Sequence, residues 1–187
     1  MFEIKAIDSS LKQTFTDYLE GISFNHSPHW ATCYCHFYHN DEPIELWFQR
    51  TGEQNKKASL DAIDQGLMKG FLAFEGSKCI GWLNANDASK YIRLKSDLVH
   101  YIKNRKVAVT ICFVIHPLHR NQGVARKLLI HAVEYYQKLG YDEMIALPSI
   151  AKINSDLHYH GSINMYKELG YQVIELKGDT LIMYKKL

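Results

Sequence analysis

The chain has 187 residues, of which 47% are hydrophobic and 22% are charged, and its 22 lysines and arginines against 20 aspartates and glutamates give a formal net charge of +2. This length and composition predict one folded domain, residues 1–187, with a sizeable core. The balanced charge gives no sign of a nucleic-acid partner or an anionic membrane surface, and no apolar run approaches the roughly 20 residues of a membrane-spanning helix.

The first 66 residues predict a mainly helical N-terminal part. In chain order, its expected elements are a strand over Phe2–Ile7, a helix capped by Ser9 or Ser10 that runs to Glu20, a short helix with Pro43 in its first turn that ends near Arg50, and a helix over Ala58–Asp64 closed by Gly66. Gly21–Pro28 predicts a loop, and Trp30–His39 has no clear period. The N-terminus lacks the basic start and long apolar run of a signal peptide.

The rest of the chain predicts a sheet with two later helices. The expected strands are Gly70–Phe74 and Lys78–Asn84, joined by a turn, then Val107–Ile115, Met144–Leu147, Val173–Leu176 and Thr180–Tyr184. The expected helices are one with apolar spacing from Val124 to Leu139, ended by Gly140, and one over Gly161–Leu169, closed by Gly170. Ala88–Asn104 is ambiguous. Helices followed by a mixed sheet indicate an α/β or α+β fold.

The junction after Val107–Ile115 has the features of an anion site. That strand is apolar on both faces, which predicts a central position in the sheet. It runs into Arg120, then Gly123, and then a helix. A helix N-terminus presents unpaired N–H groups and a partial positive charge, and a glycine there lets a phosphate approach the backbone. A plain strand–turn–helix connection is the alternative, because the usual phosphate-loop motifs are absent.

This junction resembles the acetyl-CoA motif of the GNAT family of N-acetyltransferases, [QR]-x-x-G-x-[GA], which stands here as Arg120-Asn121-Gln122-Gly123-Val124-Ala125. Downstream, MYKELGY from Met165 to Tyr171 is similar to the family's L-Y-E-K-x-G-F. The resemblance covers an acetyl-CoA-binding core over residues 107–184 and is weakest in the first 65 residues, where this family varies with substrate. It implies a central mixed, mostly antiparallel sheet flanked by helices, whose splayed central strands hold the coenzyme A arm.

The resemblance also implies a function: transfer of an acetyl group from acetyl-CoA, as co-substrate, to a primary amine by direct attack in a ternary complex. The implied cofactor-binding residues are Phe113, Val114, Ile115, Arg120, Asn121, Gln122, Gly123, Val124, Ala125 and Arg126. The pyrophosphate would contact the amides of Gln122 to Arg126, and the pantetheine arm would pair with Phe113–Ile115 as an added strand. An N–H near Phe113 or Val114 would polarise the thioester carbonyl.

Two further roles concern protons. Tyr166 stands where the family's general-acid tyrosine usually lies, so it is the candidate that protonates the departing thiolate; a packing role for its ring is the alternative. An acceptor amine of the lysine type has a pKa of about 10.4 and must lose a proton before it attacks. The central strand contains no acid, so the general base is not defined. The candidates are Asp87, His116, His26 and Glu75, besides a water chain or an amine of low pKa.

The segment HSPHWATCYCHFYH, residues 26–39, gathers possible zinc ligands at His26, His29, Cys33, Cys35, His36 and His39. Their C-x-C-H spacing is not the paired C-x-x-C of structural zinc sites. We therefore expect no metal and interpret the segment as an aromatic wall of the substrate site. With Cys79 and Cys112, the four cysteines are too few and too scattered for a disulfide scaffold, which predicts a reduced, cytoplasmic protein.

Three functions stay open on this sequence. The first is the N-acetyltransferase, acting on a small-molecule or peptide amine. The second is an acyl-CoA-binding sensor without turnover, and the third is a metal or redox module built on the His/Cys segment. We expect no nucleic-acid or membrane partner, and keep a homodimer as an open alternative.

Overall fold

The computed structural model describes residues 2–24, 27–151 and 159–187. Within these residues the strands form one seven-stranded sheet in the order β1-β2-β3-β4-β5-β7-β6. The strands are β1 (Glu3–Ala6), β2 (Gly70–Glu75), β3 (Lys78–Asp87), β4 (Val107–Ile115), β5 (Glu143–Ala146), β6 (Gln172–Lys177) and β7 (Thr180–Lys186). All neighbours are antiparallel except β4 and β5, which are parallel, so the predicted mixed, mostly antiparallel sheet is confirmed.

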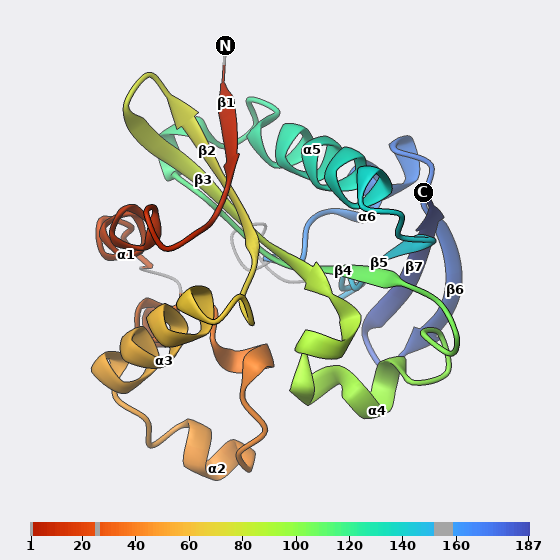
Figure 1. Cartoon of the computed structure of the whole chain (residues 1–187), viewed down its shortest axis with the longest axis horizontal. Helices are drawn as coiled ribbons and strands as arrows, with labels where there is room; N and C mark the ends of the chain where they lie inside the picture. Colours follow the sequence, from red (N-terminus) through yellow and green to blue (C-terminus); the bar gives the residue numbers. More distant parts are fainter. Residues whose placement is uncertain (1, 25–26, 152–158) are drawn as a thin grey trace.

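Helices cover both faces of this sheet (Figure 1). They are α1 (Lys12–Glu20), α2 (Ile44–Trp47), α3 (Gly52–Asp64), α4 (Lys95–Leu98), α5 (Val124–Lys138) and α6 (Ile163–Glu168). On one face, α5 and α6 bury Leu128 and Tyr166 against Leu83. On the other face, α1 and α3 enclose a second core, in which the rings of Phe15 and Trp82 lie 4.8 Å apart.

The strand β4 joins the two cores, as its apolar sequence predicts. Val109 and Ile111 belong to the α1/α3 core and Ala108 to the α5/α6 core, the alternation expected of a strand. The register then shifts: Leu83 pairs with Phe113, and Ala85 pairs with Thr110. Two steps along β3 therefore match three along β4, which is a β-bulge. The extra residue reverses the alternation, so Phe113 faces α5 and α6.

Several helix boundaries in the N-terminal part were predicted wrongly. The helix α1 follows Leu11, not Ser9 or Ser10, because the Ser10 hydroxyl and N–H both donate to the Asp8 carboxylate instead of capping the helix. The helix α3 begins at Gly52, six residues before the predicted start, because Thr51 and Gln54 form a reciprocal capping box.

Two boundaries around Pro43 also differ. This proline is the residue before α2, not part of its first turn, and α2 ends at Trp47. The two stretches for which the sequence predicted no structure, Trp30–His39 and Ala88–Asn104, contain short pieces of 3₁₀-helix. These lie at Pro28–Thr32, Phe37–His39, Ala88–Lys90 and Ile92–Leu94, besides the short α4. Such turns lack the long hydrophobic period that sequence analysis detects.

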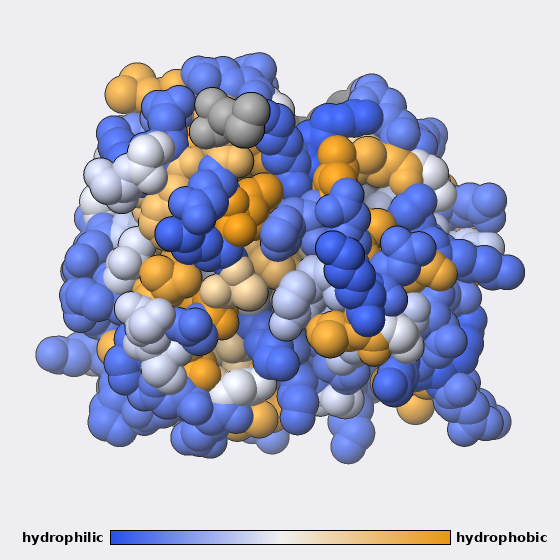
Figure 2. All heavy atoms as spheres, turned by 45° about the horizontal axis from the view of Figure 1, so that its top comes forward, coloured by the Kyte–Doolittle hydropathy of each residue, from blue (hydrophilic) through white to orange (hydrophobic). Residues whose placement is uncertain are grey.

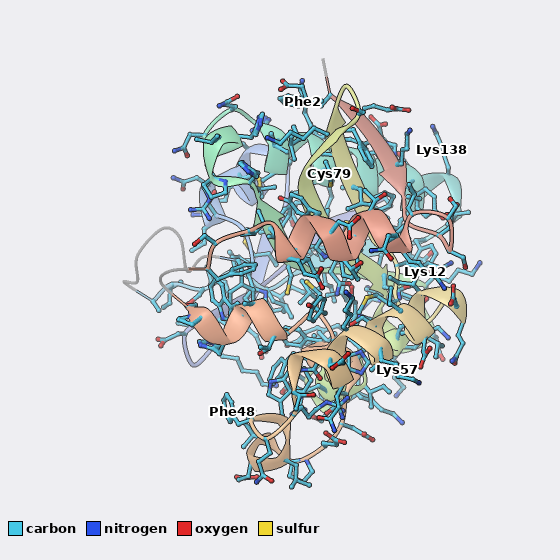
Figure 3. The ribbon with its side chains drawn as sticks, turned by 90° about the vertical axis from the view of Figure 1, so that its left-hand side faces the viewer. Phe2, Lys12, Phe48, Lys57, Cys79 and Lys138 are labelled. Atoms are coloured by element: carbon cyan, nitrogen blue, oxygen red, sulfur yellow. The ribbon has the colours of Figure 1, made fainter. Side chains whose placement is uncertain are left out.

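The surface is mixed in character. In the face shown in Figure 2, hydrophilic side chains predominate and apolar ones are scattered among them. Phe48, after α2, is 70% exposed (Figure 3). On the described part of the chain, no helix combines the length and apolar character needed to span a bilayer.

Candidate active site

The anion site predicted from the sequence falls at the junction between β4 and α5. After Ile115, a turn of 3₁₀-helix over Pro117–His119 leads to Asn121 and Gly123, whose φ angles are 58° and 79°. Only glycine adopts the second value without strain. A Cβ atom added to Gly123 would meet no atom within 4 Å, so the space in front of the first α5 amides is open. The N-terminus of α5 carries the partial positive charge of the helix dipole, which favours a phosphate there.

The polar side chains around this junction fall into two groups. Arg120 and Arg126 line the cleft in front of it; Arg120 donates to the carbonyl of Ile115 at 3.3 Å, and Arg126 pairs with Glu168. The side chain of Gln122, in contrast, donates back to the carbonyl of Leu118 at 2.8 Å, and Gln122 is not part of the cleft lining.

A cleft of about 1360 Å³ extends from this junction across the end of β4. Its volume exceeds the roughly 300–1,000 Å³ of ordinary small-molecule sites, as a long ligand requires. One end is lined by Gly123 and the start of α5, and the other by Phe24, Trp30 and Tyr159. The rings of Trp30 and Tyr159 lie 5.0 Å apart and edge to face. The cleft thus has a basic, amide-rich end and an aromatic end.

Between the two ends, β4 and β5 diverge. Their parallel register stops at Thr110 opposite Ala146, so residues 111–115 of β4 have no partner in β5. Since the β3 ladder continues to the bond between the His116 N–H and the Ile80 carbonyl, alternation directs the amide groups of Phe113 and Ile115 away from β3. On the α1 side, the Tyr18 hydroxyl donates to the Val114 carbonyl at 2.8 Å. This fork is the splay that the resemblance implied.

The predicted donors at the fork both have internal acceptors. The Phe113 N–H donates to the carbonyl of Tyr159 at 2.7 Å. Tyr166 is fully buried beneath the cleft, and its hydroxyl donates to the carbonyl of His160 at 2.8 Å and lies 3.2 Å from Thr110 Oγ1. Burial raises the pKa of Tyr166, so its phenol is protonated at neutral pH.

The general-base candidates with described positions make contacts of their own or are exposed. Asp87 accepts from the Tyr141 hydroxyl at 2.9 Å, Glu75 is exposed at the end of β2, and His116 accepts from the Leu118 N–H through Nδ1. None of these three lines the cleft. His26 is outside the described residues.

The His/Cys segment packs against the α1/α3 core. Tyr34 and Cys35 have positive φ angles of 45° and 55°, which place Cys35 in that core. Burial raises the pKa of Cys33 to about 12 and lowers that of His39 to about 4. Among the residues with described positions, no three His, Cys, Asp or Glu side chains are grouped as metal ligands.

Two contributors to the site were missed by sequence analysis. Tyr159 and His160 follow no period and precede Ser162, which caps α6 by accepting from the Met165 N–H. Their only signal is an aromatic pair directly before a helix cap. Trp30 was expected to belong to a substrate-facing wall, and it does line the cleft.

The fold and the cleft define a class of protein: an acyltransferase that uses acetyl-CoA as co-substrate. The sequence profile described as the acetyltransferase (GNAT) family matches residues 28–171, so this chain belongs to the GNAT family of acetyltransferases. No curated protein matches the chain.

Solved structures share the fold at low identity. PaiA N-acetyltransferase from Thermoplasma acidophilum, in complex with coenzyme A, is 18% identical with a TM-score of 0.57, and the alignment covers 100% of this chain and 99% of that one. The putative acetyltransferase YncA from Salmonella typhimurium, with acetyl-CoA, is 18% identical with a TM-score of 0.58, and the alignment covers 100% of this chain and 94% of that one. A Drosophila melanogaster polyamine N-acetyltransferase is 12% identical with a TM-score of 0.60, and the alignment covers 100% of both chains.

Proposed function

We propose that this enzyme transfers the acetyl group of acetyl-CoA to a primary amine by direct attack within a ternary complex. The observation that carries the proposal is that one cleft runs from the α5 N-terminus, past the fork, to the aromatic end. Both substrates then lie side by side, and no covalent acetyl-enzyme is required. Holding two reactants together in this way is worth several kcal/mol of the barrier, up to about 7–11 in well-oriented systems.

The cofactor end uses backbone more than side chains. In this proposal, the amides of Asn121 and of Gln122–Arg126, with Val124 and Ala125 in the first turn of α5, hold the pyrophosphate, and Arg120 adds a charge. The pantetheine arm pairs with Phe113–Ile115 as an added strand, because the fork leaves this edge without β5; at Phe113 the arm displaces the Tyr159 carbonyl. The N–H of Phe113, which faces away from β3, polarises the thioester carbonyl, and the thioester oxygen takes the place of the Tyr159 carbonyl that accepts from it here. The open space at Gly123 supports this arrangement.

Tyr166 serves as general acid in the proposal. Its proton is donated to a neutral carbonyl in the structure described here. A thiolate is an anion, and hydrogen bonds to ionised acceptors are roughly twice as strong as those to neutral ones. The developing thiolate therefore competes for the phenol proton only as the C–S bond breaks, which is when an acid is needed.

The amine enters at the aromatic end and gives its proton to water. At the described part of that end, the lining consists of Ser23, Phe24, Ser27, Trp30, Ile150, Tyr159 and their small neighbours, and it contains no carboxylate or imidazole. Aromatic rings bind either a cationic amine or an aryl group. We place the enzyme in the cytoplasm, because its four cysteines are free thiols.

The test is thiol release from acetyl-CoA with a panel of an arylalkylamine, a polyamine and a peptide with a free N-terminus. We expect at least one amine to support turnover. Plots of reciprocal rate against reciprocal substrate concentration should intersect, as for a ternary complex. Parallel lines would instead indicate a covalent intermediate. If acetyl-CoA raises the melting temperature but no amine releases thiol, the sensor becomes the better explanation.

A further inference from the structure

A single acidic side chain stands in the cleft that the proposed function assigns to coenzyme A. Among the described residues that line this cleft, Glu168 is the one carboxylate, and Arg120 and Arg126 are the two guanidinium groups. Coenzyme A carries its negative charge on phosphates, which a guanidinium attracts and a carboxylate repels. Glu168 therefore opposes the ligand that the rest of this end of the cleft favours.

Glu168 is paired with one of these two arginines. Arg126 lies in the first turn of α5, Glu168 is the last residue of α6, and Arg126 Nη1 donates to Glu168 Oε2. The two residues are 42 positions apart in sequence, so the pair joins two separate helices at this end of the cleft. Within the described part of the chain, Arg126 is the only partner of the Glu168 carboxylate.

The pair is open to solvent, so a ligand can exchange with it. The side chains of Arg126 and Glu168 are 42% and 62% exposed, and exposed ion pairs contribute little to stability. A phosphate that reaches Arg126 forms charge-assisted hydrogen bonds of the same kind as the carboxylate does. Since no second partner among the described residues holds Glu168, its carboxylate can turn into solvent when a phosphate takes its place.

The sequence places this acid in an unusual position. The family pattern L-Y-E-K-x-G-F has an acidic and then a basic residue after its tyrosine, whereas this chain has Lys167 and then Glu168. Lys167 is not part of the cleft lining. The reversed order therefore puts the negative side chain, and not the positive one, next to Arg126.

We propose that Glu168 limits the affinity for the coenzyme: it competes with a phosphate of acetyl-CoA, and of the product coenzyme A, for the Arg126 guanidinium. The proposal rests on the cofactor position given under the proposed function. Because both forms of the coenzyme carry the same phosphates, the competition weakens their binding equally and does not act on the chemical step. Its consequence is faster release of coenzyme A, since changes in affinity at one site lie mostly in the dissociation rate.

The first test is the affinity of Glu168→Gln for coenzyme A and acetyl-CoA, measured by titration calorimetry without any amine. We expect Kd to fall about three- to tenfold for both, because Arg126 no longer has to leave a carboxylate before it binds a phosphate. A damaged fold does not produce such a gain in affinity. An unchanged Kd overturns the proposal. A raised Kd overturns it too, because the ion pair would then hold Arg126 in place for the phosphate.

Glu134→Gln is the matched control for the loss of one negative charge. Glu134 is an exposed residue of α5, about two turns further along the helix, and it is not part of the cleft lining. Its neutralisation should change either Kd less than about twofold, because solvent and salt screen a charge at that separation. A gain equal to that of Glu168→Gln would attribute the effect to net charge and overturn the proposal.

A double-mutant cycle with Arg126→Gln tests whether the competition acts through the arginine. Arg126→Gln alone should bind acetyl-CoA more weakly than wild type, because it loses a cation of the cleft. Adding Glu168→Gln to it should lower Kd less than about twofold, since only screened repulsion between Glu168 and the phosphates is then removed. An equal gain in both backgrounds would reduce Glu168 to a repelling charge and overturn the competition.

Binding and turnover together separate this proposal from the proposed function. Stopped-flow displacement should show coenzyme A leaving Glu168→Gln more slowly than wild type, and an equal rate overturns the release step. If the variant gains affinity but no amine releases thiol from acetyl-CoA, acetyl transfer is refuted and the competition stands. If Gly123→Val abolishes acetyl-CoA binding and Glu168→Gln leaves it unchanged, the cofactor position stands and the competition is refuted.

Discussion

The two ends of the cleft are built in different ways. The cofactor end consists of long regular elements, β4 and α5, held by backbone ladders and by side chains such as Leu128 and Leu129 with no exposed surface. The acceptor end and the lobe behind it, residues 27–51, consist of single helical turns. If the cleft binds its substrates as we propose, the cofactor contacts a backbone that is fixed by the core, whereas the acceptor contacts a wall that depends on individual side chains.

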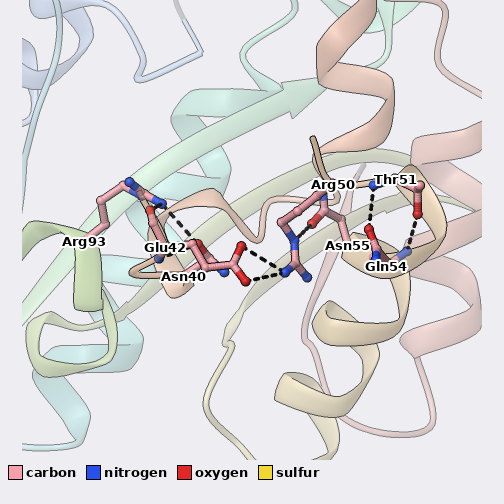
Figure 4. A network of polar contacts seen from close by, with 7 residues as sticks. All are labelled: Asn40, Glu42, Arg50, Thr51, Gln54, Asn55 and Arg93. Carbon is pink, nitrogen blue, oxygen red and sulfur yellow. Dashed lines mark hydrogen bonds and ion pairs between the residues drawn. The ribbon is translucent and has the colours of Figure 1, made fainter. Parts of the chain in front are cut away.

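Hydrogen bonds and ion pairs made by side chains, several of them drawn in Figure 4, hold the acceptor lobe together. Arg93 donates to the carbonyls of Phe37 and Glu42 at 3.0 and 2.9 Å, and its guanidinium lies 4.3 Å from the centre of the Phe37 ring. Arg50 pairs with Glu42 and donates to Asn55 at 2.6 Å. The helix α3 follows the lobe in sequence, and Lys12 of α1, labelled in Figure 3, pairs with Asp64 at the end of α3 at 2.5 Å.

The largest expected effect comes from Gly123→Val. A branched side chain there would fill the space in front of the α5 amides, and we expect it to abolish the rise in melting temperature caused by acetyl-CoA and to lower kcat/KM for acetyl-CoA at least about a hundredfold. The measurement is thermal unfolding with and without acetyl-CoA, followed by steady-state kinetics.

Gly140→Val is the matched control for that variant. Gly140 follows the other end of α5, has a positive φ of 71°, and also has no atom within 4 Å of an added Cβ. A valine at this position therefore introduces the same backbone strain without touching the cleft. The Gly140→Val variant should be less stable than wild type, but acetyl-CoA should still raise its melting temperature. If the Gly123→Val variant binds acetyl-CoA with unchanged affinity, the phosphate site is not at this junction.

The next effect is that of Tyr166→Phe, which tests chemistry at the fork. General acid catalysis typically contributes about 10²–10⁴-fold, and we expect a fall in kcat near or below the lower end, with little change in KM, because a coenzyme A thiol is a fair leaving group. Tyr171→Phe is the control: its hydroxyl is buried without a partner among the described residues, and its ring lies 5.0 Å from that of Tyr166. If kcat of the Tyr166→Phe variant is within about twofold of the wild-type value, Tyr166 has only a packing role.

Arg93→Lys tests the acceptor wall. The lysine keeps the charge but not the several N–H donors of the guanidinium group, so we expect a loss of about 2 kcal/mol in the free energy of unfolding. KM for the acceptor should rise severalfold while acetyl-CoA binding is unchanged. Arg105→Lys, which loosens contacts to Glu143 and the Tyr101 carbonyl outside the cleft, should lower stability alone. Equal effects on both substrates would contradict the independence of the two ends.

The last prediction concerns pH and leaves the activity at neutral pH unchanged. Burial lowers the pKa of His36 and His39 from 6.5 to about 4. Between pH 6.5 and 4 the unfolded chain binds protons that the folded chain does not, so stability falls as the pH falls through this window, by about 1–3 kcal/mol for a fully buried histidine. The melting temperature should therefore drop from pH 6.5 to 4.5, and less so in His39→Gln. An equal drop in that variant would remove His39 from the explanation.

Local sequence determined most of the cofactor end. Val107–Ile115 was predicted to the residue, because its apolar run is bounded by polar residues and a proline. The start of α5 after Gly123 followed from a backbone conformation that glycine favours, and the end near Gly140 from the same cause. In these places the signal and the structure depend on the same few neighbouring residues.

Only the tertiary structure decided which residues lie between β4 and β5 where these strands diverge, and which side chains form the acceptor wall. The bulge in β4 depends on pairing with β3, and the contacts of His160 join residues 49 to 122 positions apart in sequence, as with Ile111 and Tyr38. Periodicity reports which face of an element is apolar, but a hydrogen bond from a side chain to a distant carbonyl leaves no periodic trace. The same reason explains why Ser10 faces Asp8 instead of capping α1, and why Tyr166, correctly placed on a helix, has its proton on an acceptor that its neighbours did not predict.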